Sequence, residues 1–311
     1  MMETIICTMK LDSHMTTTQI MVPPPLCPSS ECKVIESFAF LISSFGLVGN
    51  ETVIWLLGFR MKRNPFTTFI LNLAVADFGV LIYIVIDCTV YIMLLFSNTN
   101  IGSRLTELLS ISIFFFLHFT GQFLLTAISI DRCVSVLFPI WHKCHRPTFL
   151  STSVCAFLWV ASFLFCLTPY IIFITSLYEI LFILLAVTLL LCLPLMIISS
   201  LVLFIKVCFK SPKHKRGKAL TAIFLTLMFF IILVFPVFSS LLLTFLVDIK
   251  LYQRVSHYSF LGAALNSSVN PFIYFLVGRQ KRGQRREKMK NILQRLFKEE
   301  EGHGADMDSP V

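Results

Sequence analysis

Charged residues are scarce in this chain. Asp, Glu, Lys and Arg make up only 14% of its 311 residues, whereas a soluble domain carries roughly a quarter. Hydrophobic residues account for 56%, Phe alone occurs 32 times, and the mean hydropathy is +0.82. This composition excludes an ordinary soluble protein and requires an apolar solvent, which a lipid bilayer provides.

The sequence also lacks the motifs of several other classes of protein. The sequence contains no GxSxG or HExxH motif and no paired acids within an apolar stretch, so it is not expected to be an enzyme. Its ten Cys show no metal-ligand spacing, and most lie in apolar stretches, where a free thiol is the default. Residues 255–277 contain no Lys for a retinal Schiff base, which excludes the usual kind of light sensor.

Long apolar stretches fill most of the chain. Each is about long enough to cross a bilayer, which takes about 20 residues, and each should be helical because lipid offers backbone groups no partner. The predicted fold is an all-α membrane protein, a seven-transmembrane helix bundle with a short amphipathic eighth helix. The spans are expected at 34–60, 67–95, 104–137, 148–173, 178–208, 218–247 and 255–277.

Three segments follow from this assignment. Residues 1–33 are polar and contain several Pro, which predicts a disordered extracellular N-terminus before the membrane domain at 34–277. The cytoplasmic tail, 278–311, carries an apolar stripe at helical spacing opposite basic residues, which predicts the amphipathic helix. The stripe consists of Met289, Ile292, Leu293, Leu296 and Phe297.

The basic residues predict the orientation. If the N-terminus is outside, most of the 26 Lys and Arg fall in the inner loops and the tail. This positive-inside bias predicts a multi-pass plasma membrane protein with an extracellular N-terminus. The net charge of +9 sits in short clusters beside the spans, so we expect binding to anionic inner-leaflet lipid and no binding to nucleic acid.

A few polar residues interrupt the predicted spans. Asn50, Asp77, Asn266 and Asn270 lie within spans, and Arg132 lies at the inner end of the third. Polar groups in lipid are costly and usually face the interior of a bundle. They either join helices or form a switch, and Pro271, which removes a backbone donor beside Asn270, favours the switch.

Ordered motifs in six of the spans carry a family resemblance. They are Gly49-Asn50, LNLAVAD at 71–77, Asp131-Arg132-Cys133, Pro194, Pro236 and NPFIY at 270–274. With these motifs the chain resembles the rhodopsin-like G-protein-coupled receptors. Longer runs, at 55–61, 131–141, 144–147 and 266–271, are similar to the Mas-related family of these receptors. The resemblance implies an orphan-type receptor that binds an extracellular ligand and activates heterotrimeric G proteins, with Gq or Gi coupling.

The resemblance also implies roles for the polar residues. The G-protein coupling and activation switch would consist of Asp131, Arg132, Asn270, Pro271 and Tyr274. The polar core, which would hold water and a sodium ion, would consist of Asn50, Asp77, Asn266 and Asn270. Receptors of this kind often have Ser where this chain has Gly121, so the sodium pocket would lack one oxygen. Glu51, directly after Asn50, has no role that the sequence explains.

Acidic residues are expected around the outer mouth of the bundle. They would attract a cationic peptide or amine, although each is about as well explained as part of a solvated rim. His118 lies deeper in span three and is either a contact at the cavity floor or a hydrogen-bonded core histidine. The ligand-pocket candidates are Asp87, Glu107, His118, Glu179 and Asp248.

Departures from the rhodopsin-like pattern give further expectations. Glu107 replaces the usual span-three Cys, while Cys166 and Cys192 lie too deep to pair, so no disulfide is predicted. Arg216 stands where many receptors have an acid that holds the counterpart of Arg132, so basal signalling should be measurable.

The tail suggests weak regulation. After Gly278 the tail has a single hydroxyl residue, Ser309, which predicts weak arrestin recruitment because receptor kinases modify hydroxyls. A small-cation transporter or channel built on the same bundle remains the alternative function.

Overall fold

Helices account for nearly all of the described chain. The computed structural model describes residues 30–61, 64–96, 104–147, 149–171, 188–209, 225–226, 228–229, 231–232 and 249–278, and these include no strand. The elements are α2 (Ser30–Trp55), a π-helical turn η1 (Leu56–Arg60), α3 (Pro65–Phe96), α4 (Arg104–Leu137), α5 (Pro139–Cys144), α6 (Leu150–Ile171), a second π-helical turn η2 (Thr188–Cys192), α8 (Leu193–Phe209) and α11 (Ile249–Gly278).

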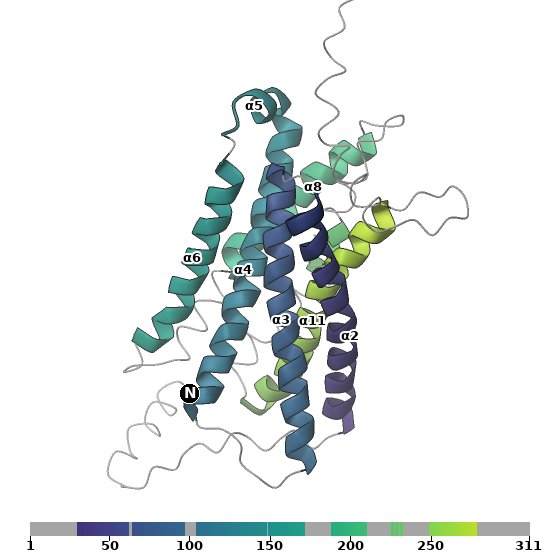
Figure 1. The fold of residues 1–311 in the computed structure, drawn as a ribbon, viewed down its shortest axis with the longest axis vertical. Coiled ribbons are helices and arrows are strands. Elements are labelled where there is room, and N and C mark those ends of the chain that lie inside the picture. The colour runs from purple at the N-terminus through teal and green to yellow at the C-terminus, as the bar shows by residue number, and fades with distance from the viewer. Residues whose placement is uncertain are drawn as a thin grey trace, which may run out of the picture.

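The long helices lie alongside one another as a bundle, with α5 at one end (Figure 1). They correspond to predicted spans one to five and seven, and α4 has the predicted bounds. Among the described residues, three helical segments are long and apolar enough to cross a membrane: Ser30–Arg60, Pro65–Met93 and Ser112–Ser135. Most of predicted span six and the predicted amphipathic helix lie outside the described residues.

The bundle has an Arg132 end and a Glu36 end. The Arg132 end is where α4 ends and α3 begins, and α5 marks it in Figure 1. The Glu36 end is where α2 and α11 begin. α4 packs against α3, α6 and α8, while α2 packs against α3 and α11.

The start of α3 is capped by its own sequence. The Thr67 amide donates to Asn64 Oδ1 at 2.7 Å, and the Asn64 amide donates to Thr67 Oγ1 at 2.8 Å. Pro65 stands between them at the first helical position, where its missing N–H costs nothing. This reciprocal cap satisfies backbone donors at the helix start and fixes where α3 enters the bundle.

Glycines bring α2 close to α11. A Cβ built at Gly49 would lie 3.0 Å from Pro271 Cβ, and one at Gly46 would lie 2.7 Å from Ser268 Cβ. Small residues allow helices in a membrane to approach closely, and packing then supplies much of the association energy. The close contact fixes α11 against the polar face of α2.

Apolar side chains pack in two main clusters. One lies toward the Arg132 end and includes Leu57, Leu73, Leu124, Met196 and Tyr274. The other lies toward the Glu36 end and includes Ala39, Ile84, Cys88, Phe114 and Ala264. The polar core lies between these clusters.

The prediction that the chain has no disulfide is wrong. Cys32, in the first turn of α2, is disulfide-bonded and 1% exposed, and its partner lies outside the described residues. The free-thiol default holds for cysteines inside apolar spans, whereas Cys32 lies before the expected start of the first span. Cys166 and Cys192 are free, as predicted.

Candidate functional site

A buried carboxylate and a buried amide meet in the middle of the bundle. Asp77 on α3 is 2% exposed and Asn270 on α11 is 1% exposed. Asn270 Nδ2 donates to Asp77 Oδ2 at 2.8 Å, and Ser267, one turn earlier on α11, also bonds the carboxylate. The sequence placed both residues in one polar core, and the structure joins them directly.

Asn50 ties α2 to the same part of α11. Its Nδ2 donates to the Gly46 carbonyl at 3.1 Å and to the Ser267 carbonyl at 2.9 Å. The Oδ1 atoms of Asn50, Asn266 and Asn270 are buried and accept no hydrogen bond within the described part of the chain. On the α4 side a Cβ at Gly121 would lie 3.7 Å from Asp77 Oδ1. Buried oxygens without donors are costly, so this core suits a bound cation or a water molecule that donates hydrogen bonds.

Pro271 and Tyr274 continue the α11 face toward the Arg132 end. α11 passes through Pro271 without a break between Ile249 and Gly278. Tyr274 is 4% exposed and belongs to the apolar cluster at that end. The predicted switch residues of α11 therefore run from the polar core to the Arg132 end of the bundle. Glu51, in contrast, is exposed on α2.

Arg132 lies buried at its end of the bundle. Its side chain is 5% exposed, and Nη2 lies 2.6 Å from Asp131 Oδ2. The guanidinium carbon stacks 4.1 Å from the centre of the Phe66 ring on α3, a favourable cation–π geometry. These two contacts hold the guanidinium within the bundle.

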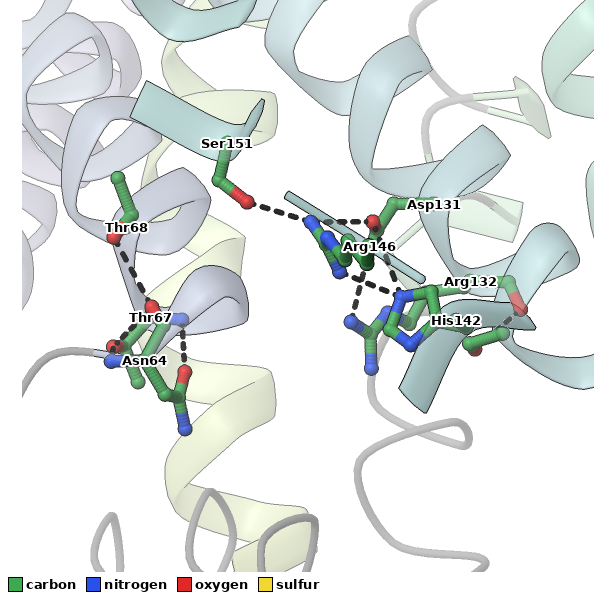
Figure 2. Close-up of polar contacts among 9 residues, drawn as sticks. Asn64, Thr67, Thr68, Asp131, Arg132, His142, Arg146 and Ser151 are labelled. Atoms are coloured by element: carbon green, nitrogen blue, oxygen red, sulfur yellow. Dashed lines mark hydrogen bonds and ion pairs between the residues drawn. The ribbon is translucent and has the colours of Figure 1, made fainter. Parts of the chain in front are cut away.

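The connection after α4 adds a second arginine, which Figure 2 shows between Asp131, His142 and Ser151. Arg146 Nη2 lies 2.8 Å from Asp131 Oδ1 and donates to Ser151 Oγ on α6 at 2.6 Å. Arg146 Nη1 lies 2.6 Å from His142 Nε2 on α5. A guanidinium only donates, so Nε2 accepts this bond, and the 3.5 Å contact of Nε2 with Asp131 is not an ion pair in this geometry.

A third polar cluster joins α2, α3 and α11 at the Glu36 end. Glu36 is 3% exposed. Its Oε1 accepts a 2.6 Å bond from His257 Nδ1, and its Oε2 accepts a 3.0 Å bond from the Cys88 thiol. Asp87 is partly buried on α3, within electrostatic range of Glu36 and His257.

An aromatic cluster separates Asp87 from the polar core. The rings of Tyr83, Phe114 and Phe260 lie 4.9–6.2 Å apart, centre to centre. His118, one turn further along α4, is 4% exposed and stacks on Phe114 at 5.7 Å. The structure thus places His118 among core aromatics. The side chains of Glu107, Glu179 and Asp248 lie outside the described residues.

Comparison with known proteins identifies the family. Residues 49–274 match the family described as "7 transmembrane receptor (rhodopsin family)". The chain belongs to this family. It is 36% identical to the human proto-oncogene Mas over 268 residues, which covers 83% of this chain and 82% of that protein. It is 38% identical to the human Mas-related G-protein coupled receptor member X1, covering 83% and 81%, and 35% identical to mouse member H, covering 84% and 82%.

The predicted fold class and family are therefore confirmed. The chain is a seven-helix G-protein-coupled receptor of the Mas-related group and a multi-pass protein of the plasma membrane, and its partners include heterotrimeric G proteins. It is a receptor and not an enzyme.

Sequence reasoning missed several polar residues of the receptor. Glu36 has a signal in the sequence, because it precedes Ser43 and Asn50 by seven and fourteen residues and so shares their helix face. His257 faces it from the corresponding turn of α11. Arg146 lies in the family-like run at 144–147, but no periodicity predicts what a loop side chain contacts.

Proposed function

We propose that this receptor lies with its N-terminus outside, binds a cationic peptide or amine at the Glu36 end, and activates Gq or Gi at the Arg132 end. The observation that carries the proposal is the position of Arg132. Its buried guanidinium sits at one end of α4, held by a carboxylate that neighbouring elements also contact. An arginine held at the edge of the bundle can be released from its carboxylate, and the released guanidinium can then contact a soluble partner.

Exposed apolar side chains beside Arg132 support contact with a G protein there. Phe138 is 61% exposed and Ile140 is 76% exposed, both at the junction of α4 and α5. Phe149, just before α6, is 67% exposed. A cluster of exposed apolar side chains next to a functional cation is typical of an interaction surface. We assign this surface to the G protein α-subunit.

The polar core supplies the coupling between the two ends. α11 carries both Asn270, which bonds Asp77, and Tyr274, which packs at the Arg132 end. A proline within that helix removes one backbone hydrogen bond and makes a change of shape less costly. We infer that ligand binding shifts α11 against α2 and α3, and that this shift releases Arg132.

The mouth of the bundle favours a ligand bound near its rim. Asp87 lies beside the Glu36–His257 pair, and the packed rings of Tyr83, Phe114 and Phe260 fill the space on its inner side. A cationic group attracted by Asp87 would therefore stop above these rings.

Sodium binding in the polar core is part of the proposal. The available atoms are oxygens, as a hard cation requires: the Asp77 carboxylate and the buried Oδ1 atoms of Asn266 and Asn270. Gly121 supplies no oxygen but leaves space beside Asp77. The residues fit the ion, which would add positive charge to a core with unpaired acceptors.

Replacing NaCl by choline chloride should lower the melting temperature of the purified receptor, because a bound ion stabilises the folded state by mass action. Asp77→Asn should remove this difference, since the carboxylate of the core loses its charge. Asp87→Asn, a matched change on the same helix, should retain it. If sodium still raises the melting temperature of Asp77→Asn, the assignment of the sodium site to the polar core is wrong.

Regulation at the inner surface completes the proposal. We assign the basic juxtamembrane clusters to anionic inner-leaflet lipid and expect weak arrestin recruitment, because the tail has a single hydroxyl residue. The tail and most of the basic residues of these clusters lie beyond the described residues.

Basal G-protein dissociation in cells tests the coupling. At matched surface levels the wild-type receptor should give a measurable signal, and Arg132→Ala should reduce it to the level of cells without receptor. The reason is that the guanidinium is the group proposed to contact the G protein. An Arg132→Ala variant that signals like the wild type would refute this role.

A further inference from the structure

The carboxylate of Asp131 is shared between two arginines. Oδ2 lies 2.6 Å from Arg132 and Oδ1 lies 2.8 Å from Arg146, an arrangement visible in Figure 2. An ionised carboxylate accepts several hydrogen bonds through its two oxygens. Arg132 and Arg146 therefore do not compete for one atom, and each contact fixes the orientation in which Asp131 presents its other oxygen.

All three charged groups are withdrawn from water. The side chains of Arg132, Arg146 and Asp131 are 5%, 6% and 11% exposed. Buried charges interact more strongly than exposed ones, and removing one partner leaves the others uncompensated. The contact between Asp131 and Arg146 is therefore expected to matter for the state in which Arg132 is held.

Arg146 is itself fixed by two other elements. Its Nη2 also bonds Ser151 on α6, and its Nη1 bonds His142 on α5, both at 2.6 Å. A planar guanidinium with donors in a fixed fork can satisfy three acceptors at once, which an ammonium group does less well. Arg146 thus connects the carboxylate of α4 to α5 and to the start of α6.

We propose that Arg146 is a positioning residue that keeps the receptor in its resting state. It fixes the Asp131 carboxylate, and the fixed carboxylate holds Arg132 against Phe66. In this chain the contact comes from the segment after α4, whereas the stretch before span six offers Arg216 where an acid would be needed. The inference rests on the proposed function, in which released Arg132 contacts the G protein.

The main test is basal G-protein dissociation at matched surface levels for Arg146→Ala. We expect a rise of about fivefold or more over the wild type, the low end of ordinary coupling between sites. General structural damage would lower the signal per receptor, so a rise separates positioning from simple stability. Arg146→Lys keeps the charge but loses the forked donors of the guanidinium. Its basal signal should therefore lie between those of the wild type and Arg146→Ala.

Two further variants keep the test decisive. Ser151→Ala removes one hydrogen-bond partner of Arg146 with little change in volume, and it should give a smaller rise in the basal signal. This variant tests the inference if Arg146→Ala fails to reach the surface. Arg60→Ala is the matched control, because Arg60 stacks on Trp55 at 4.8 Å and is exposed. Its basal signal should equal that of the wild type.

The outcomes separate the inference from the function on which it rests. If Arg132→Ala abolishes signalling but neither Arg146→Ala nor Ser151→Ala raises it, the positioning role is wrong and the proposed function stands. Arg146→Ala could instead lower the basal signal. This result would mean that Arg146 weakens the contact between Asp131 and Arg132, and it would also overturn the inference. If Arg132→Ala signals normally, the proposed role of Arg132 fails first. If the basal signal rises in Arg146→Ala and is abolished when Arg132→Ala is added, both the positioning role and the proposed function are supported.

Discussion

Replacing Gly46 by Val is expected to lower the surface level of the receptor by about fivefold or more, because overpacking a well-packed site typically costs about 1–3 kcal/mol. A Cβ at this position would overlap the Ser268 hydroxyl and lie 2.9 Å from Leu81 Cδ1. Both neighbours lie on helices that pack against α2. The added side chain would separate α2 from α11 and strain the Asn50 bond to the Ser267 carbonyl.

Gly58→Val is the matched control for this experiment. Gly58 lies on η1, in the same membrane segment, and a Cβ there would meet no atom within 4 Å. Flow cytometry with an epitope tag on the N-terminus measures the surface level of both variants against the wild type. A Gly46→Val receptor present at the wild-type level would show that α2 and α11 do not approach as closely as described.

Removing the Glu36 carboxylate is expected to cause the second large loss. Glu36→Ala would leave His257 and the Cys88 thiol without their shared acceptor. Leaving a buried hydrogen-bonding group without its partner typically costs about 1–3 kcal/mol. We expect the melting temperature of the purified receptor to fall by several degrees, as followed by a thiol-independent assay such as intrinsic fluorescence.

Two controls identify the cause of such a loss. Glu31→Ala removes an exposed acid from the first turn of the same helix and should leave the melting temperature almost unchanged. A double-mutant cycle with His257→Gln measures the pair itself, because the two changes should not be additive if the side chains interact. Additive losses would mean that each residue acts through other contacts.

The polar core was predictable from the sequence because polar side chains are so rare in these spans. Asn50, Asp77 and Asn270 stand out against apolar neighbours, and in lipid such groups seek one another. The structure joins Asp77 to Asn270 directly. The extents of α3, α4 and α6 were predictable to within two residues at each end, because the bilayer sets the length of a span.

The contacts at the two ends of the bundle were not predictable in this way. Glu36 lies within three residues of the expected start of its span, where an acid can equally face water, and only its contacts with α3 and α11 show that it is buried. Arg146 lies in a connection, and loops carry no period that indicates a partner. The Cys32 disulfide was not predictable either, because no periodicity indicates which cysteines pair.

Nucleotide exchange on purified G proteins tests the central claim most directly. The receptor, reconstituted in lipid nanodiscs, would be mixed with Gi or Gq heterotrimers, and GTPγS uptake would be followed for the wild type, Arg146→Ala and Arg132→Ala. The account predicts that the wild type accelerates uptake by at least one of the two, that Arg146→Ala accelerates it further, and that Arg132→Ala does not. No acceleration of either G protein by the wild type or Arg146→Ala, together with cation flux in proteoliposomes, would contradict the account and favour a transporter or channel.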